Sequence, residues 1–243
     1  MKTSVSIRSL MLPAALLVAA APLQAGEIVP PKIIQTVTAR FPVSQENSTN
    51  RTGEAVVLVS ITAEGKLGDL LVAGYSHPDF ATEAVNVLRQ WRFEPAQLDG
   101  QPVSVRLTLQ FDFQTTMRVI NLPARDSLAA LARLPAGAAG RNLVADARNL
   151  DAALALLESP APQHPRAAAP TPEGRVTLDF FVDETGRARL PVVVESTHQA
   201  YTDAAVQALA AWRFSIPTSQ SRPVIVRTQQ TFLFSAPTDP VAE

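Results

Sequence analysis

Two stretches of the chain combine an amphipathic helix with a strand that follows at once. In residues 80–93, FATEAVNVLRQWRF, apolar side chains recur at helical spacing and polar side chains occupy the opposite face. Residues 201–214, YTDAAVQALAAWRF, repeat this pattern. Asp79, which follows Pro78, is predicted to be the N-cap of the first helix. Because an apolar stripe must be covered, each helix is predicted to pack on a sheet.

The similarity extends beyond the helices at a constant offset of 121 residues. It holds over some sixty residues, which we interpret as two copies of one small domain. The matched positions include Gly53 and Gly174, Gly65 and Gly186, His77 and His198, Trp91 and Trp212, Arg106 and Arg227, and Phe111 and Phe232.

Strands are predicted on both sides of each helix. Residues 55–62 alternate as a half-buried strand, Gly65 allows a tight turn, and residues 67–73 return. Residues 103–113 form the last strand, with the odd-numbered side chains facing inward. The predicted fold class is α+β, with two domains in which one helix packs on a three-stranded antiparallel sheet in the order β-β-α-β.

The second copy repeats these strands at residues 176–182, 190–195 and 224–234. Its last strand is less apolar, because Thr228 and Gln230 replace Leu107 and Leu109 on the inward face. This strand is either an exposed edge or covered at its middle by something polar.

Five segments are predicted. They are a signal peptide (1–25), a first domain (26–117), a helical connector (118–160), a second domain (161–236) and a tail (237–243). The lead-in 26–40 is compatible with one or two helical turns. The connector is predicted to hold two helices, at 126–134 and 142–158, and the proline-rich residues 159–172 an extended spacer.

The leader has two cations, Lys2 and Arg8, before an apolar run of about a dozen residues, shorter than the roughly 20 that span a bilayer. A cleaved, exported protein is predicted, and an uncleaved inner-membrane anchor is the alternative. The net charge of −1 argues against a nucleic-acid partner. The absence of cysteine excludes disulfides and thiolate chemistry.

No convergent catalytic set is visible. None of the three histidines (His77, His164 and His198) stands at metal-ligand spacing to another. No nucleophile elbow or phosphate-binding glycine loop occurs. We therefore expect no enzyme, metal, cofactor or small-molecule substrate. Trp91 and Trp212 are interpreted as core anchors.

The last strand is the most informative feature, because the edge of a sheet can accept an extended peptide through its free N–H and C=O groups. Arg106 and Arg227 lie on its outward face. They either protect an edge by their charge or flank a docking groove.

These residues resemble the TonB C-terminal domain family. The first copy contains Phe41-Pro42, Gly53-Glu54-Ala55-Val56, Ala63-Glu64-Gly65 and Trp91-Arg92-Phe93-Glu94-Pro95. The second contains His164-Pro165, Gly174-Arg175-Val176, Thr185-Gly186 and Trp212-Arg213-Phe214. His164 stands where the family has Tyr, and Ile216-Pro217 displaces the proline by one position.

The resemblance implies a periplasmic protein that grips the extended TonB box of an outer-membrane transporter, or a similar segment of another envelope protein. The guest adds a strand beside the last strand, aided by the segment before the domain. The implied partner-binding residues are Arg40, Phe41, Val103, Val105, Arg106, Leu107, Gln163, His164, Val224, Val226, Arg227 and Thr228.

Three functions stay open. The first is a periplasmic tandem binding module. The second is a transport energy transducer that keeps its N-terminal anchor. The third is a structural protein whose domains pair edge to edge, within one chain or in a homodimer.

Overall fold

The computed structural model describes residues 28–46, 52–114, 118–122, 141–165 and 173–235. The predicted signal peptide, the predicted helix 126–134 and the tail 237–243 lie outside these residues. For residues 118–122 and 141–142 only the backbone is described.

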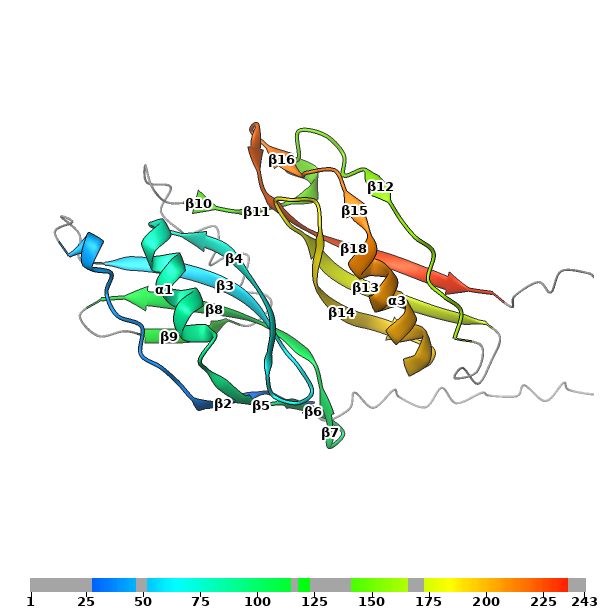
Figure 1. Cartoon of the computed structure of the whole chain (residues 1–243), viewed down its shortest axis with the longest axis horizontal. Coiled ribbons are helices and arrows are strands. Elements are labelled where there is room, and N and C mark those ends of the chain that lie inside the picture. Colours follow the sequence, from blue (N-terminus) through cyan, green and yellow to red (C-terminus); the bar gives the residue numbers. More distant parts are fainter. Residues whose placement is uncertain (1–27, 47–51, 115–117, 123–140, 166–172, 236–243) are drawn as a thin grey trace, which may run out of the picture.

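The first domain is built on three long antiparallel strands with one helix across them (Figure 1). A short strand extends the sheet at each edge, so that the strand order is β10-β4-β3-β8-β9. The elements are β3 (Gly53–Ile61), β4 (Leu67–Tyr75), α1 (Pro78–Leu88), β8 (Val105–Phe113), β9 (Arg118–Leu122) and β10 (Arg141–Asn142).

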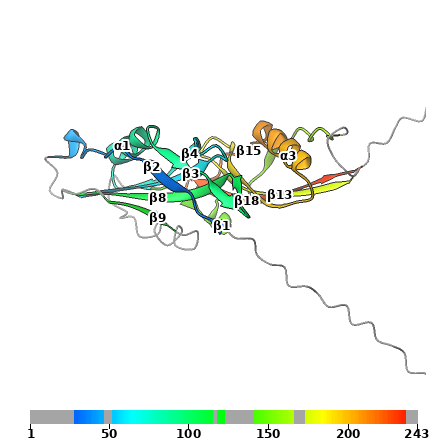
Figure 2. The same ribbon diagram turned by 90° about the horizontal axis from the view of Figure 1, so that it is seen from below.

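The second domain repeats this arrangement with the strand order β11-β18-β13-β14. Its elements are β11 (Val144–Ala145), β13 (Gly174–Val182), β14 (Ala188–Ser196), α3 (Gln199–Ala211) and β18 (Ile225–Phe234). Both helices lie on the same side of their sheets (Figure 2). The predicted α+β class, with a β-β-α-β order in each domain, is confirmed.

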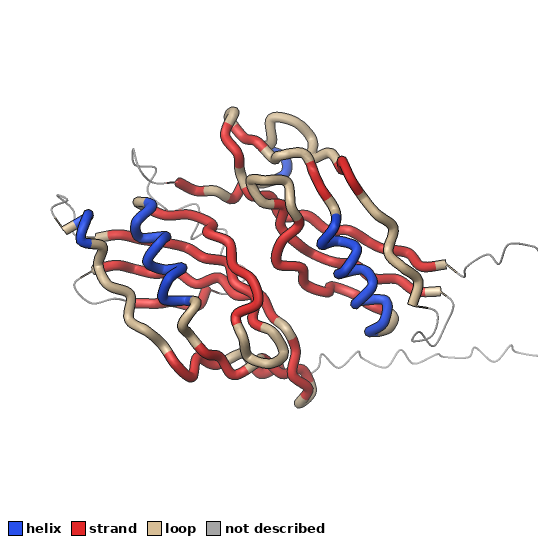
Figure 3. Tube along the Cα trace, viewed as in Figure 1, coloured by secondary structure: helices blue, strands red, loops and turns tan. Residues whose placement is uncertain are grey.

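Short strands frame both domains, and strand predominates over helix (Figure 3). They are β1 (Ile28–Val29) and β7 (Gln101–Val103) on either side of β6 (Ala96–Leu98), β2 (Lys32–Gln35) with β5 (Arg92–Glu94), β12 (Leu156–Glu158) with β15 (Arg213–Phe214), and β16 (Thr218–Ser219) with β17 (Arg222–Pro223). Two 3-10 turns cover Val43–Gln45 and Ala147–Asn149. The described part of the lead-in, residues 28–40, contains β1 and β2 and no helical turn, so the prediction of helical turns there is wrong.

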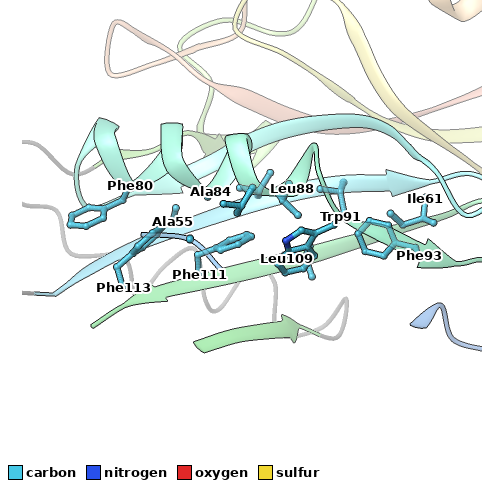
Figure 4. Packing of buried hydrophobic residues seen from close by; sticks show 14 residues of the cluster. Ala55, Ile61, Phe80, Ala84, Leu88, Trp91, Phe93, Leu109, Phe111 and Phe113 are labelled. Carbon is cyan, nitrogen blue, oxygen red and sulfur yellow. The ribbon is translucent and has the colours of Figure 1, made fainter. Parts of the chain in front are cut away.

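Each domain has its own core between helix and sheet. In the first core Phe80 packs against Phe113 and Trp91 against Phe111, and Leu88 and Leu109 belong to the same cluster (Figure 4). The indole N–H of Trp91 donates to the carbonyl oxygen of Val37 at 3.1 Å, and that of Trp212 donates to Pro160 at the same distance. The two tryptophans are buried core anchors, as predicted, and each also holds the segment that precedes its domain.

The helices begin at histidines. Nδ1 of His77 accepts from the backbone N–H of Asp79, and Nδ1 of His198 accepts from that of Ala200. Asp79 is thus not the N-cap, because Pro78 already occupies the first helical turn. Its carboxylate instead accepts hydrogen bonds from Ser44 and Gln45, which lower the pKa of Asp79.

The prediction of a helix at 142–158 is wrong. This segment is extended apart from one 3-10 turn, and it pairs with β18 through β11 and with β15 through β12. Leu150 and Leu154 pack against the second core. The carboxylate of Asp151 accepts from the backbone N–H groups of Gln220 and Ser221. Pairing and burial against a finished domain override the helical spacing of the leucines.

A third cluster of buried side chains lies between the two domains, and we call it the interface core. It joins the outward faces of the two sheets with two residues of the connector. Its members are Val56, Leu58, Leu71, Ala73, Leu143, Phe181, Leu190 and Ile225, with Val72, Tyr75 and Val144 partly buried beside them. The prediction that residues 55–62 are half-buried is therefore wrong, because β3 is covered on both faces.

Residues 141–145, here called the bridging segment, connect the two sheets through the backbone. β10 pairs with β4 antiparallel, and β11 pairs with β18 in parallel. Between them, the N–H of Leu143 donates to Ala73, and its carbonyl accepts from the N–H of Ile225. The bridging segment lies between the two halves in Figure 1.

Candidate functional site

The edges of the two sheets are the surfaces on which a guest strand can add. In the first sheet β9 pairs with Thr108–Asp112 of β8, directly after the predicted residues Val105, Arg106 and Leu107, so the chain itself occupies this part of the edge of the last strand. β10 covers Gly74 and Tyr75 of β4 on the opposite edge. Both edges of the first sheet are thus partly occupied by neighbouring segments of the same chain.

The second sheet is more open. β11 covers only Ile225 and Val226 of β18. Residues 229–233, at the offset of 121 from the covered residues 108–112, pair with β13 on one side and with no described strand on the other. We call residues 229–233 the open edge. Within the described part of the chain β14 also pairs only with β13.

The open edge and β14 differ in regularity. β18 pairs with β13 in continuous register from Val226 to Phe234, with no proline in that stretch. β14 contains Pro191 and has two register shifts against β13. Proline and bulges are common protections of an edge against pairing. β14 therefore carries such protections, and the open edge does not.

Among the predicted site residues of the first domain, the structure assigns Arg106 to the contact between domains. Its guanidinium lies 2.5 Å from Oδ1 of Asp179, donates to the carbonyl oxygen of Leu190 at 3.1 Å, and stacks 4.7 Å above the ring of Phe181. The Arg106 side chain is 15% exposed. Val105 and Leu107 pack against the first core, and Val103 is half-buried.

Asp179 is the centre of this contact. Its side chain is 3% exposed and also accepts from Arg227 at 2.9 Å and from Gln229 at 3.1 Å. Burial raises the pKa of Asp179, but the hydrogen bonds from Arg106 and Gln229 and the two arginine charges outweigh it, so that the pKa is lowered. Two arginines at equivalent positions of the repeat therefore hold one carboxylate.

A second ion-pair group lies nearby. Arg189 of β14 binds both carboxylate oxygens of Asp69 in the first domain, and donates to the carbonyl oxygen of Leu70 at 3.1 Å. It also donates to Asp183 at 3.2 Å within its own domain. The contact with Leu70 occupies a main-chain acceptor of β4, so this edge of the first sheet is further covered.

The segments before the two domains lie near the ends of the last strands. Phe41 packs edge-on against Phe80, which contacts Phe113 at the end of β8. In the second domain, His164 packs edge-on against both Tyr201 and Phe234. The structure therefore brings Phe41 and His164 to the end of the last strand.

The remaining predicted site residues differ in how far they are buried. Arg40 is exposed, and its N–H donates to the carboxylate of Glu83. Gln163 is also exposed. Val224 and Val226 are buried at the covered start of β18, whereas Thr228 is half-buried beside the open edge.

Sequence reasoning missed Asp179 and β9. A signal for the first was present, because Asp179 is a lone charge in an apolar strand, at the offset of 121 from Leu58. Similarly, the run Val56-Val57-Leu58-Val59 is typical of a strand buried on both faces. For β9 the signal is the short aliphatic run in residues 118–122, RVINL, directly after the last strand.

A profile of the family described as "Gram-negative bacterial TonB protein C-terminal" matches residues 40–115 and 160–236, which together make up more than half of the chain. The chain belongs to the TonB C-terminal domain family. The two matches span both helices and the three long strands of each domain. The family and its tandem arrangement, both inferred from the sequence, are thereby confirmed.

One solved structure similar to this chain is the solution NMR structure of the Pseudomonas aeruginosa TonB CTD. It is 27% identical, covers 36% of this chain and 90% of its own, and superposes with a TM-score of 0.30. A search of curated proteins gave no match. TonB C-terminal domains interact with envelope proteins, and membership of the family supports an interaction of this general kind for the present chain.

Within the described residues, none of the helices has the length and apolar character needed to cross a membrane. No group of three or more histidine, aspartate or glutamate side chains there is arranged to hold a metal ion.

Proposed function

We propose that this protein is a periplasmic tandem binding module that takes up an extended segment of an envelope protein by strand addition. The guest is a TonB box of an outer-membrane transporter or a similar segment. The observation that carries the proposal is the open edge of β18, which has a regular ladder on one side and no described strand on the other.

The side chains around the open edge suit an extended guest. Gln229, Thr231 and Leu233 are exposed on one face of the sheet, and Leu233 is 70% exposed. Gln230 is half-buried on the helix side. Main-chain hydrogen bonds would supply affinity, while alternate guest side chains would contact these residues and supply selectivity.

The proposed binding region lies further along the last strand than the predicted residues Val224, Val226, Arg227 and Thr228. Val224, Val226 and the first part of the strand are covered by β11 or buried, so Arg227 and Thr228 mark the beginning of the available edge. His164 lies at its far end, against Phe234. Gln163 is exposed next to it and is proposed to contact the guest.

This role is non-catalytic and needs no cofactor, metal or small-molecule substrate. It places the protein in the periplasm, with residues 1–25 acting as a cleaved signal peptide. N-terminal sequencing of the exported protein checks this point. Retention of Met1 or Lys2 would instead favour the anchored transducer.

The test uses residues 26–243 and a synthetic peptide with the TonB box of an outer-membrane transporter, titrated by calorimetry. Gln230→Pro and Thr231→Pro are compared. Successive N–H groups of a strand point to opposite neighbours, so one proline removes a donor to β13 and the other removes only an outward donor. The variant that stays folded is expected to weaken binding at least tenfold.

Val192→Pro and Val193→Pro, on the other edge of the same sheet, are the matched controls. Whichever of these two control variants folds should bind the peptide as tightly as the original protein does. Equal binding by the folded β18 variant would contradict the proposal, and so would loss of binding in the β14 control. If light scattering shows a tight dimer that the β18 proline disrupts, the edge pairs copies of this chain instead.

A further inference from the structure

The two domains differ at one place that the repeat makes directly comparable. In the first domain, residues 108–112 of β8 pair antiparallel with β9, from Thr108 opposite Leu122 to Asp112 opposite Arg118. In the second domain the equivalent residues 229–233 form the open edge. Among the described residues, the same strand edge thus occurs once with an added strand and once without one.

The sequence supports a real difference between the copies. β9 reads Arg-Val-Ile-Asn-Leu, with three aliphatic residues and no proline. The residues at the offset of 121 read Asp-Pro-Val-Ala-Glu and lie outside the described residues. Pro240 has no N–H to donate to a ladder, and Asp239 has low strand propensity.

β9 also has a large thermodynamic advantage over a free competitor, because it is tethered to the strand that it covers. Only residues 114–117 separate it from the end of β8. A short tether of this kind holds a segment at an effective concentration on the order of millimolar. A free peptide with the same intrinsic affinity must therefore reach about that concentration to displace half of β9.

Resting on the proposed function, we infer that β9 is an internal guest that keeps the binding edge of the first domain closed. The second domain then receives a guest in the resting protein, and the first domain receives one only after β9 has left. β9 also defines the class of ligand, which is a short, extended, aliphatic segment without proline.

The test supplies β9 in trans, as a seven-residue peptide of residues 116–122, Thr-Met-Arg-Val-Ile-Asn-Leu. Binding to residues 26–243 is measured by calorimetry. Val119→Pro and Ile120→Pro are compared, because only one of these two N–H groups can point toward β8. Hydrogen exchange of the amides of 108–112 identifies the variant that opens the edge. Replacement of 118–122 by Gly-Ser-Gly-Ser-Gly is the further opened form.

The unaltered protein is expected to bind one equivalent at micromolar peptide, and the opened forms two. When it is combined with an opened form, the folded member of the Gln230→Pro and Thr231→Pro pair should lose the equivalent bound at β18 and keep the one bound at β8. The inference is overturned if the unaltered protein binds two equivalents at micromolar peptide. It is also overturned if opened forms, verified by exchange, gain none. One equivalent in the opened forms and none in the unaltered protein would retain the internal guest and reject the open edge of β18.

Discussion

Glycines with the same backbone conformation differ in what surrounds them, and this difference yields a prediction. Gly65 and Gly186 have φ of +73° and +77°, and a Cβ there would lie 2.2 Å from the carbonyl oxygen of Phe93 or Phe214. Gly100 has φ of +76° and no neighbouring atom within 4 Å of such a Cβ. The first two glycines therefore provide both a left-handed turn and a close approach between two backbones.

Gly65→Ala and Gly186→Ala are expected to cost roughly 3 kcal/mol or more of unfolding free energy, because the backbone contact adds overpacking to the conformational strain. Gly100→Ala is the control, with an expected cost of about 1 kcal/mol from φ alone. Urea unfolding measures all three. Equal costs at the three positions would show that the contact with Phe93 and Phe214 is unimportant.

Asp179 gives a second prediction at the scale of the residue. Asp179→Ala leaves Arg106 and Arg227 without their common carboxylate, and Arg106 is largely buried. Breaking a buried pair by removing one partner costs about 3 kcal/mol. Arg227→Ala, at the half-exposed partner, should cost clearly less. A smaller loss for Asp179→Ala than for Arg227→Ala in urea unfolding would contradict this interpretation.

The dependence of stability on pH follows from the same carboxylate. The pKa of Asp179 is lowered in the folded protein, so around this pKa the folded state binds fewer protons than the unfolded state does. The stability that Asp179 contributes is present above the unfolded pKa of about 3.9 and is lost as the pH falls through the folded value. Asp179→Asn should flatten the fall in melting temperature below about pH 4, measured by calorimetry against the unaltered protein. If the melting temperature of Asp179→Asn falls with pH as steeply as that of the unaltered protein, Asp179 is not the group responsible.

At the scale of elements, the lead-in strands depend on single hydrogen bonds from buried side chains. Trp91→Phe and Trp212→Phe remove the donors to Val37 and Pro160 while keeping an aromatic ring in each core. The loss of a buried hydrogen bond and of ring volume is expected to cost about 2 kcal/mol. Hydrogen exchange should rise mainly in residues 32–38 or 156–161. Uniform acceleration across the domain would contradict the local role.

The elements that were predicted correctly have a strong local signal. Each long helix shows helical periodicity, and each last strand alternates over ten residues or so, and the repeat doubles the weight of both. The prediction of a helix in the connector failed because leucines at 150, 154 and 157 fit a helix as well as they fit an extended segment. The extended conformation is selected by β15 and β18, because the connector forms backbone hydrogen bonds with these two strands. A partner far along the chain does not appear in local spacing.

At the scale of the molecule, the interface core and the bridging segment predict that the two domains unfold together. Residues 26–243 should show a single calorimetric transition. Leu143 is 5% exposed and lies between the two sheets. Leu143→Asp places an unpaired charge in the interface core and should separate the transition into two.

Leu157→Asp is the matched control, because this side chain is 66% exposed. It should leave one transition with nearly the same midpoint. Two transitions in the unaltered protein would show that the contact between the domains is too weak to couple their unfolding.

The tandem organisation was readable from the repeat, but the contact between the domains was not. Repetition reveals what the copies share, and the interface depends on what differs between them. Asp179 replaces Leu58, Leu190 replaces Asp69, and Arg189 replaces Gly68 at equivalent positions. The candidate site was similarly predicted at both last strands, and the occupation of one of them by β9 depends on a segment outside the repeat.

The interface core has a consequence for how this gene can change. Its apolar side chains come from both copies, so each copy covers an apolar surface of the other. Loss of one half by recombination would leave Val56, Leu58 and Leu71, or Phe181, Leu190 and Ile225, facing water. Substitutions should therefore be tolerated more readily on surfaces that the other copy does not cover than in the interface core.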